Sequence, residues 1–216
     1  MKLNLPSKIT IARIALILPV IVFYALLRVS NWFVIPMTAF YVIASCTDFI
    51  DGHIARSRNM VTTLGKFLDP IADKVLVATG LIIIVNMGMF KLVGVIGAII
   101  ILGRELAISA FRQIAASKGV IMAADKLGKL KTVFTLIAIP AIFLARLLFI
   151  DITFVRVIGY IFYIFGFVMF VISLILTVVS GYNYIVSNKK VFEDNDEHQD
   201  GDVTATDDSP SDDLKI

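Results

Sequence analysis

Hydrophobic residues dominate six long segments of the chain, and short polar segments separate them. The six apolar segments cover approximately residues 9–28, 32–54, 68–90, 92–116, 132–149 and 154–187. A helix needs roughly 20 residues to cross the hydrocarbon core of a bilayer. None of the segments has the alternation of apolar and polar residues that is typical of transmembrane β-strands. The pattern predicts an all-α integral membrane protein with six transmembrane helices.

The two ends of the chain differ from these segments. The stretch from Met1 to Arg13 has no signal-peptide cleavage pattern and contains Pro6, so we expect a short interfacial segment that leads into the first helix. Residues 193–216 hold ten of the 17 acidic residues and few apolar ones, a composition typical of disorder. The sequence therefore predicts a six-helix membrane catalytic domain at residues 1–192 and an acidic, disordered tail at residues 193–216.

Composition and charge support this division. The chain is 58% hydrophobic and 17% charged, whereas soluble domains average roughly 45–50% and 25%. The net charge of +3 hides a membrane part, residues 1–192, with 19 basic and 7 acidic side chains. If the N-terminus is cytosolic, 12 of those basic residues fall on the cytosolic side and 4 on the other. The positive-inside rule then predicts a multi-pass protein of the cell membrane with both termini in the cytosol.

Four of the seven acidic residues in the membrane part lie within 26 positions, at Asp48, Asp51, Asp69 and Asp73. A carboxylate at membrane depth is costly and therefore indicates function. Any one of them could instead pair with Arg56, Arg58 or Lys66 at a solvated helix end. Their joint spacing argues against that alternative. On a helix, one face would carry Asp48, Asp51, Gly52 and Ala55, and one face of the next helix would carry Gly65, Asp69 and Asp73, with Thr62 if the helix extends back that far.

Carboxylates that converge in this way repel one another unless cations neutralise them. Mg²⁺ and Mn²⁺ prefer oxygen ligands, and two such ions about 3.5–4 Å apart form a clamp for phosphoryl displacement. Arg56 lies one helical turn beyond Gly52 and could hold a diphosphate through two hydrogen bonds. The pattern indicates two divalent metal ions and phosphoryl-transfer chemistry. Pro70 fits the second helix if that helix starts close by.

These residues resemble the signature of the CDP-alcohol phosphatidyltransferase family at all eight fixed positions, Asp48-x2-Asp51-Gly52-x2-Ala55-Arg56-x8-Gly65-x3-Asp69-x3-Asp73. The resemblance extends to the six-helix layout. It implies a transferase that uses a CDP-linked lipid and a hydroxyl acceptor and releases CMP. It also implies a homodimer, with no nucleic acid as a partner.

The resemblance also implies a role for each residue. Asp48 and Asp69 would bridge the two metals, Asp51 would complete one metal site, and Asp73 would complete the other and act as the general base for the acceptor hydroxyl. The CDP-lipid would contact Gly52, Ala55, Arg56, Thr62 and Gly65.

The acceptor is indicated by charges in the fourth apolar segment and the loop after it. Arg104, Glu105 and Arg112 interrupt the apolar segment, and Arg104 is 13 residues beyond Lys91, or roughly 20 Å along a helix. We expect a wet cavity there. A basic pocket would suit an acceptor alcohol that itself carries a phosphate group. The residues that would form it are Arg104, Arg112, Lys129 and Lys131. The loop lysines alternatively follow from the positive-inside rule alone.

The stretch Arg104–Thr132 resembles that of bacterial phosphatidylglycerophosphate synthases, a branch of the family, as does the opening Leu5–Arg13. This chain departs from the pattern of the branch at one position, where it has Thr135 and many members have Gln. The branch implies CDP-diacylglycerol and glycerol-3-phosphate as substrates, with the active site facing the cytosol. Alternatives within the family are a cardiolipin synthase that uses phosphatidylglycerol and a phosphatidylserine synthase. An alternative from another class is a cation transporter.

Overall fold

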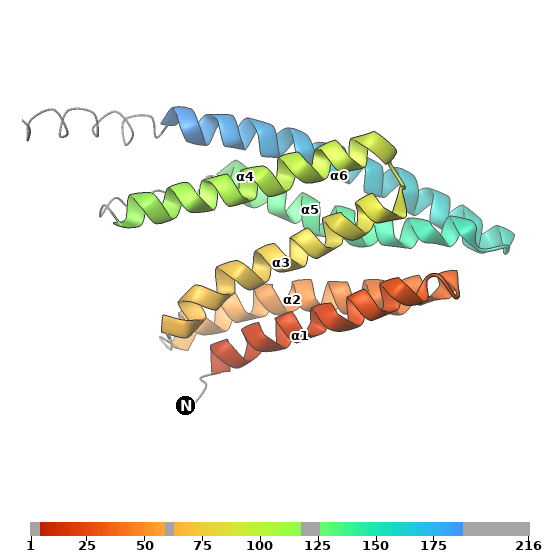
Figure 1. Cartoon of the computed structure of the whole chain (residues 1–216), viewed down its shortest axis with the longest axis horizontal. Coiled ribbons are helices and arrows are strands. Elements are labelled where there is room, and N and C mark those ends of the chain that lie inside the picture. Colours follow the sequence, from red (N-terminus) through yellow and green to blue (C-terminus); the bar gives the residue numbers. More distant parts are fainter. Residues whose placement is uncertain (1–4, 59–62, 118–125, 188–216) are drawn as a thin grey trace, which may run out of the picture.

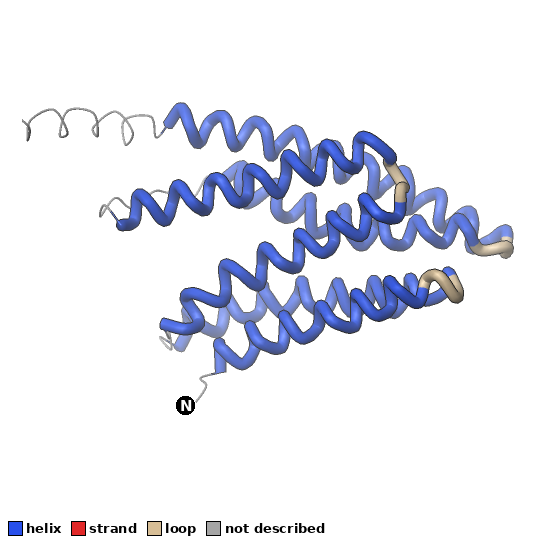
Figure 2. Tube along the Cα trace, viewed as in Figure 1, coloured by secondary structure: helices blue, strands red, loops and turns tan. Residues whose placement is uncertain are grey.

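The computed structural model consists of helices joined by short connections, and helix is the only regular structure in the part of the chain that it describes (Figure 2). It describes the backbone of residues 5–58, 63–117 and 126–187, and the side chains of residues 11–47, 71–116 and 127–187. The elements are α1 (Leu5–Leu26), η1 (Asn31–Phe33), α2 (Val34–Arg58), α3 (Thr63–Met87), α4 (Lys91–Ser117), α5 (Lys126–Leu144), η2 (Ala145–Phe149) and α6 (Thr153–Ser187). The predicted all-α class is confirmed.

Consecutive helices run in alternating directions. Helices α1, α3 and α5 begin, and α2, α4 and α6 end, on the same side of the molecule, at the left in Figure 1. On the opposite side α3 turns tightly into α4. Gly88 follows the last residue of α3 there with φ +66°, the left-handed conformation that commonly terminates a helix. This course brings the aspartate segment and the start of α5 to the same side of the molecule.

The helix boundaries agree broadly with the apolar segments of the sequence. Helix α1 begins at Leu5, so the part of the predicted interfacial segment from Leu5 to Arg13 belongs to this helix. The condition attached to Pro70, a helix start close by, is not met, because α3 begins at Thr63 and the proline is therefore not in its first turn. Residues 1–4 and the predicted acidic tail, 193–216, lie outside the described residues.

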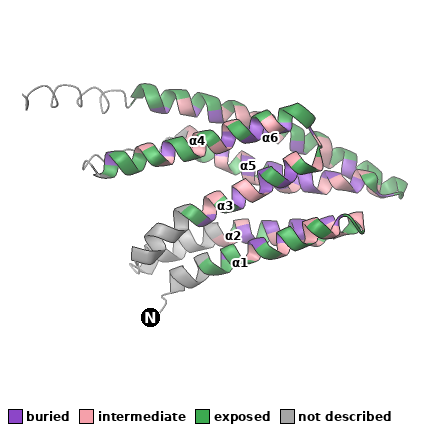
Figure 3. Ribbon diagram, viewed as in Figure 1, coloured by how far each residue is buried: buried purple, intermediate pink, exposed green. Residues whose placement is uncertain are grey.

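Within the part of the chain that the structure describes, three helical stretches are long and apolar enough to cross a bilayer, namely 91–116, 127–149 and 153–187. Two shorter apolar helices cover residues 11–26 and 31–47. Many large apolar side chains on the outer faces are exposed, while the buried residues lie between the helices (Figure 3). These features fit an integral membrane protein, whose outer surface contacts lipid. Six membrane crossings and two cytosolic termini stay predictions.

Helix α6 packs closely against α5 and η2 because the residues on its buried face are mostly small. A Cβ atom at Gly159 would lie 2.4 Å from the backbone nitrogen of Leu148, and one at Gly166 would lie 2.8 Å from Cγ1 of Ile142. Small residues permit such backbone approach between membrane helices. The buried face comprises Gly159, Gly166, Phe170, Ser173, Thr177, Ser180 and Tyr184.

Helices α2, α3 and α5 meet at Gly80 of α3. A Cβ atom there would lie 2.7 Å from Cγ2 of Ile139 and 3.0 Å from the ring of Tyr41. The Tyr41 ring also packs edge-on against Phe143, with 5.3 Å between centroids. Asp73 lies two helical turns before Gly80 and therefore on the same face of α3. The contact at Gly80 directs that face toward α5.

Candidate active site

The aspartate segment occupies the adjoining ends of two consecutive helices. Asp48, Asp51, Gly52, Ala55 and Arg56 belong to α2, and Gly65, Asp69 and Asp73 belong to α3. Of these residues, only Asp73 has a described side chain, and Thr62 lies outside the described residues altogether. Among the side chains that are described, no three potential metal ligands of the His, Cys, Asp or Glu type come together. The metal site therefore stays a prediction.

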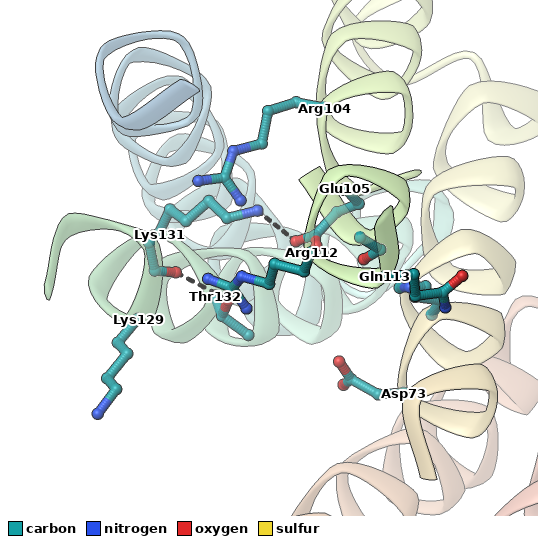
Figure 4. A pocket seen from close by; sticks show the side chains of 11 residues that line it. Asp73, Arg104, Glu105, Arg112, Gln113, Lys129, Lys131 and Thr132 are labelled. Carbon is teal, nitrogen blue, oxygen red and sulfur yellow. Dashed lines mark hydrogen bonds and ion pairs between the residues drawn. The ribbon is translucent and has the colours of Figure 1, made fainter. Parts of the chain in front are cut away.

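A cavity of about 440 Å³ lies among α3, α4 and α5 on the side of the aspartate segment. Asp73 extends into it from α3, and Arg104, Glu105 and Arg112 reach it from α4 (Figure 4). Five basic and two acidic side chains line this polar cavity, so its formal charge is positive. The full lining is Asp73, Lys74, Arg104, Glu105, Ser109, Arg112, Gln113, Gly128, Lys129, Lys131 and Thr132.

Glu105 of α4 and Lys131 of α5 form an ion pair inside the polar cavity (Figure 4). Only 2% of the Lys131 side chain is exposed, compared with 26% for Glu105. A buried charge is tolerated when an opposite charge and hydrogen bonds compensate it. Asp73 also lies within electrostatic range of Lys131. The Lys131 ammonium group is thus held across α4 and α5 by Glu105, and the carboxylate of Asp73 attracts it at longer range.

The two arginines of the polar cavity are braced by α6. Arg104 donates a hydrogen bond from Nη2 to the hydroxyl of Ser180 at 3.0 Å. The guanidinium carbon of Arg112 lies 5.6 Å from the ring centroid of Tyr184, within the range of a cation–π interaction. Arg112 and Lys129 are exposed, whereas Arg104 is partly buried. All four predicted phosphate ligands line one cavity with Asp73; phosphate binding itself stays a prediction.

A second, apolar cavity of about 230 Å³ adjoins the polar one between α3 and α4. The two cavities share Asp73, Lys74, Glu105 and Thr132. The rest of the apolar cavity is lined by Val75, Val77, Ala78, Leu102 and Leu106. The carboxylate of Asp73 therefore lies at a boundary between a charged space and an apolar one, an arrangement that suits one polar and one lipid-linked reactant.

Sequence reasoning assigned no function to several residues at this site. Glu105 interrupts an apolar helix but carries no predicted role at the site, and the sequence predicts no role at the site for Ser180 or Tyr184 of α6. A signal for α6 was present, because its serines and Tyr184 recur at helical spacing within the most apolar segment. The contact between Ser180 and Arg104 joins residues 76 positions apart, so no local pattern could reveal it.

Comparison with known protein families agrees with this geometry. The family model described as CDP-alcohol phosphatidyltransferase matches residues 3–179. The chain belongs to the CDP-alcohol phosphatidyltransferase family, and the resemblance seen in its aspartate motif is confirmed.

Individual relatives of the chain carry more specific names than the family does. A CDP-diacylglycerol–glycerol-3-phosphate 3-phosphatidyltransferase of Bacillus subtilis is 38% identical over 196 residues, covering 86% of this chain and 95% of the relative. One of the same name from Rickettsia felis is 34% identical over 196 residues, covering 88% and 97%. A cardiolipin synthase (CMP-forming) of Oryza sativa is 34% identical over 158 residues, covering 67% of this chain and 46% of the relative. The predicted enzyme class is confirmed, and a cation transporter receives no support.

Proposed function

We propose that the protein transfers the phosphatidyl group of CDP-diacylglycerol to glycerol-3-phosphate, giving phosphatidylglycerophosphate and CMP. Relatives named for this reaction align with most of the chain. The observation that carries the proposal is the polar cavity, in which cationic side chains from α4 and α5 lie opposite Asp73. Glycerol-3-phosphate brings a phosphate for the cations and a hydroxyl for the carboxylate.

The acceptor phosphate would bind to Arg104, Arg112, Lys129 and Lys131. Charge-assisted hydrogen bonds to phosphate are stronger than neutral ones, and an arginine can form two at once. The contributions should differ among the four. Lys131 already pairs with Glu105, so its ammonium group is partly neutralised, whereas Arg112 and Lys129 are exposed at the cavity. Arg112 should therefore contribute more than Lys131.

The proposed chemistry at Asp73 is general-base catalysis. The acceptor hydroxyl oxygen forms a bond to the phosphorus that carries diacylglycerol, and the bond from that phosphorus to the CMP oxygen breaks. The hydroxyl proton passes to the carboxylate of Asp73, which extends into the polar cavity. A positioned base of this kind contributes roughly 10²–10⁴-fold to rate.

Two divalent ions, Mg²⁺ or Mn²⁺, would be held by Asp48, Asp51, Asp69 and Asp73. The donor set fits, since four carboxylates at adjoining helix ends offer the oxygen ligands that these ions prefer. When bound, the ions would neutralise the diphosphate and the departing CMP. The CDP-lipid would be contacted by Gly52, Ala55, Arg56, Thr62 and Gly65.

The proposal also places the enzyme in the cell membrane. Three helices among the described residues are long and apolar enough to cross a bilayer, which supports a membrane location. We propose six crossings, two cytosolic termini, an active site that faces the cytosol, and a homodimer. The aspartate segment and the start of α5 lie on the same side of the molecule, which is consistent with this orientation.

A direct assay tests the reaction. Purified protein in mixed micelles receives CDP-diacylglycerol, Mn²⁺ and one acceptor at a time, and CMP and the lipid product are measured. We expect turnover with glycerol-3-phosphate and little with serine or phosphatidylglycerol. Turnover with phosphatidylglycerol alone would favour a cardiolipin synthase, the second candidate, which the relative from Oryza sativa supports. Turnover with serine alone would refute both.

A further inference from the structure

Helix α6 belongs to the longest and most apolar of the candidate membrane spans, yet one of its faces carries hydroxyl groups. Ser173, Thr177, Ser180 and Tyr184 follow one another at spacings of four, three and four residues. The first three have no exposed surface and Tyr184 retains 4%. Buried hydroxyls cost free energy unless they form hydrogen bonds. The partners of this polar face of α6 therefore indicate what it does.

Ser180 holds the guanidinium group of Arg104. Its hydroxyl donates to the carbonyl oxygen of Thr177 at 3.3 Å and accepts from Nη2 of Arg104 at 3.0 Å. Since a hydroxyl has a single proton, the bond within α6 turns the acceptor side of the oxygen toward Arg104. Gly181 makes room for the arginine, because a Cβ atom there would lie 3.4 Å from its Cγ.

The polar face also contacts two further basic residues that line the polar cavity, Lys131 through its backbone and Arg112 through its side chain. The hydroxyls of Ser173 and Thr135 share a hydrogen bond of 2.5 Å, in which either can donate, and both lie within hydrogen-bond distance of the carbonyl oxygen of Lys131, at 3.4 Å and 2.9 Å. One turn beyond Ser180, the ring of Tyr184 lies under Arg112. No residue of α6 lines the polar cavity itself. Its influence on the cavity must therefore pass through the residues that it contacts, Arg104, Arg112 and Lys131.

We propose that the polar face of α6 is a positioning element for acceptor-phosphate binding, with Ser180 as the positioning residue for Arg104. The inference rests on the proposed function, because its consequence is stronger binding of the acceptor phosphate. Arginine side chains lose considerable conformational entropy when they are ordered. A guanidinium group that Ser180 already holds loses less of that entropy when the phosphate arrives.

The variant Ser180→Ala tests the inference. We expect the KM for glycerol-3-phosphate to rise about tenfold, the size of effect that loss of a hydrogen bond to a charged group produces, while kcat and the KM for CDP-diacylglycerol change less than about twofold. The matched control is Thr38→Val. Thr38 is a buried threonine on α2 whose hydroxyl donates to the carbonyl oxygen of Val34 at 2.7 Å, and its replacement should leave both KM values unchanged.

A second measurement separates this inference from the proposed function. The Kd for inorganic phosphate, measured by calorimetry without the lipid substrate, should rise about tenfold in Ser180→Ala and stay unchanged in Thr38→Val. If the wild-type protein binds phosphate but does not use glycerol-3-phosphate, the proposed function fails and the phosphate Kd still decides the inference. Wild-type protein that binds no phosphate, or an unchanged Kd in Ser180→Ala, would overturn the inference.

A double variant tests whether Ser180 acts through Arg104. Residues that act through one contact show non-additive effects, so Arg104→Gln with Ser180→Ala should bind phosphate as Arg104→Gln alone does. A further tenfold loss in the double variant would refute the assignment. A merely structural role is also distinguishable, because it would lower kcat and raise both KM values together; that outcome counts against the inference.

Discussion

Lys131 of α5 donates a hydrogen bond to the carboxylate of Glu105 on α4, across the wall of the polar cavity. The pair joins two helices through residues 26 positions apart, and the lysine is almost completely buried. One carboxylate thus compensates a cation that loss of contact with water would otherwise disfavour. The ion pair also limits how far α4 and α5 can separate beside Asp73.

Removal of the carboxylate should destabilise the protein. Breaking a fully buried ion pair by removing one partner costs about 3–5 kcal/mol; Glu105 is 26% exposed, so we expect Glu105→Leu to lower the free energy of unfolding by about 2 kcal/mol. Thermal unfolding in detergent, followed by circular dichroism, measures the change. The double variant Glu105→Leu, Lys131→Met should recover most of it. A single variant as stable as wild type would show that the ion pair contributes nothing.

Asp73→Asn should abolish most turnover because the amide cannot accept the acceptor proton. We expect CMP release to fall by about 10²–10⁴-fold. Asp151→Asn is the control, since Asp151 is exposed and pairs with Arg156 at the surface; its activity should equal that of wild type. More than a tenth of wild-type turnover in Asp73→Asn would remove Asp73 from the role of base.

Arg112→Gln should weaken use of the acceptor and leave use of the lipid intact. Arg112 lines the polar cavity and is exposed to it, and loss of a charge-assisted hydrogen bond corresponds to about a tenfold rise in the KM for glycerol-3-phosphate. Initial rates at varied acceptor and at varied CDP-diacylglycerol separate the two KM values. Arg156→Gln, on a surface ion pair, is the control. An equal rise in both KM values would contradict the assignment.

Chelation of divalent ions should stop the reaction. With EDTA in excess, CMP release should fall to background, and excess Mg²⁺ or Mn²⁺ should restore it, because carboxylates favour hard divalent cations. EDTA already saturated with Mg²⁺ controls for other effects of the chelator. Full activity in metal-free buffer would exclude the two-metal proposal for the aspartate segment.

Gly159→Ala should disturb the packing of α6. The added methyl group would lie 2.4 Å from the backbone nitrogen of Leu148, and backbone cannot yield as a flexible side chain does. Overpacking typically costs about 1–3 kcal/mol, which thermal unfolding in detergent would detect. Gly103→Ala serves as the control, because nothing lies within 4 Å of its Cβ position. Equal stability of the two variants would contradict the close contact.

The sequence was sufficient to predict the helices, because its apolar segments are about as long as membrane-spanning helices and lack the alternation of membrane-spanning strands. It left the start of the third helix open at Pro70, and α3 begins at Thr63, so that the proline lies inside the helix. Preferences in the first turn are small, and the rest of the helix outweighed them. Residues near a helix end are the hardest to place by such preferences.

The candidate site likewise contains residues that the sequence predicts and contacts that it does not. The aspartate spacing is local, so periodicity and family resemblance were enough to select Asp73. The cations of α4 and α5 were also selected, because charges interrupt apolar segments there. Their partners were not predictable, since Glu105 with Lys131 and Arg104 with Ser180 are tertiary contacts that depend on how the helices cross. Thr135, which departs from the family pattern, is buried against Ser173 of α6.

The adjoining polar and apolar cavities imply that the concentration of each substrate has to be expressed in a different way. Because both spaces meet at Asp73, a lipid can react without leaving the bilayer while its co-substrate arrives from water. Encounter with the lipid then depends on its mole fraction in the membrane plane, and encounter with the acceptor depends on its bulk molarity. Dilution with inert phospholipid should slow the enzyme at constant total concentrations, as expected for catalysis at an interface.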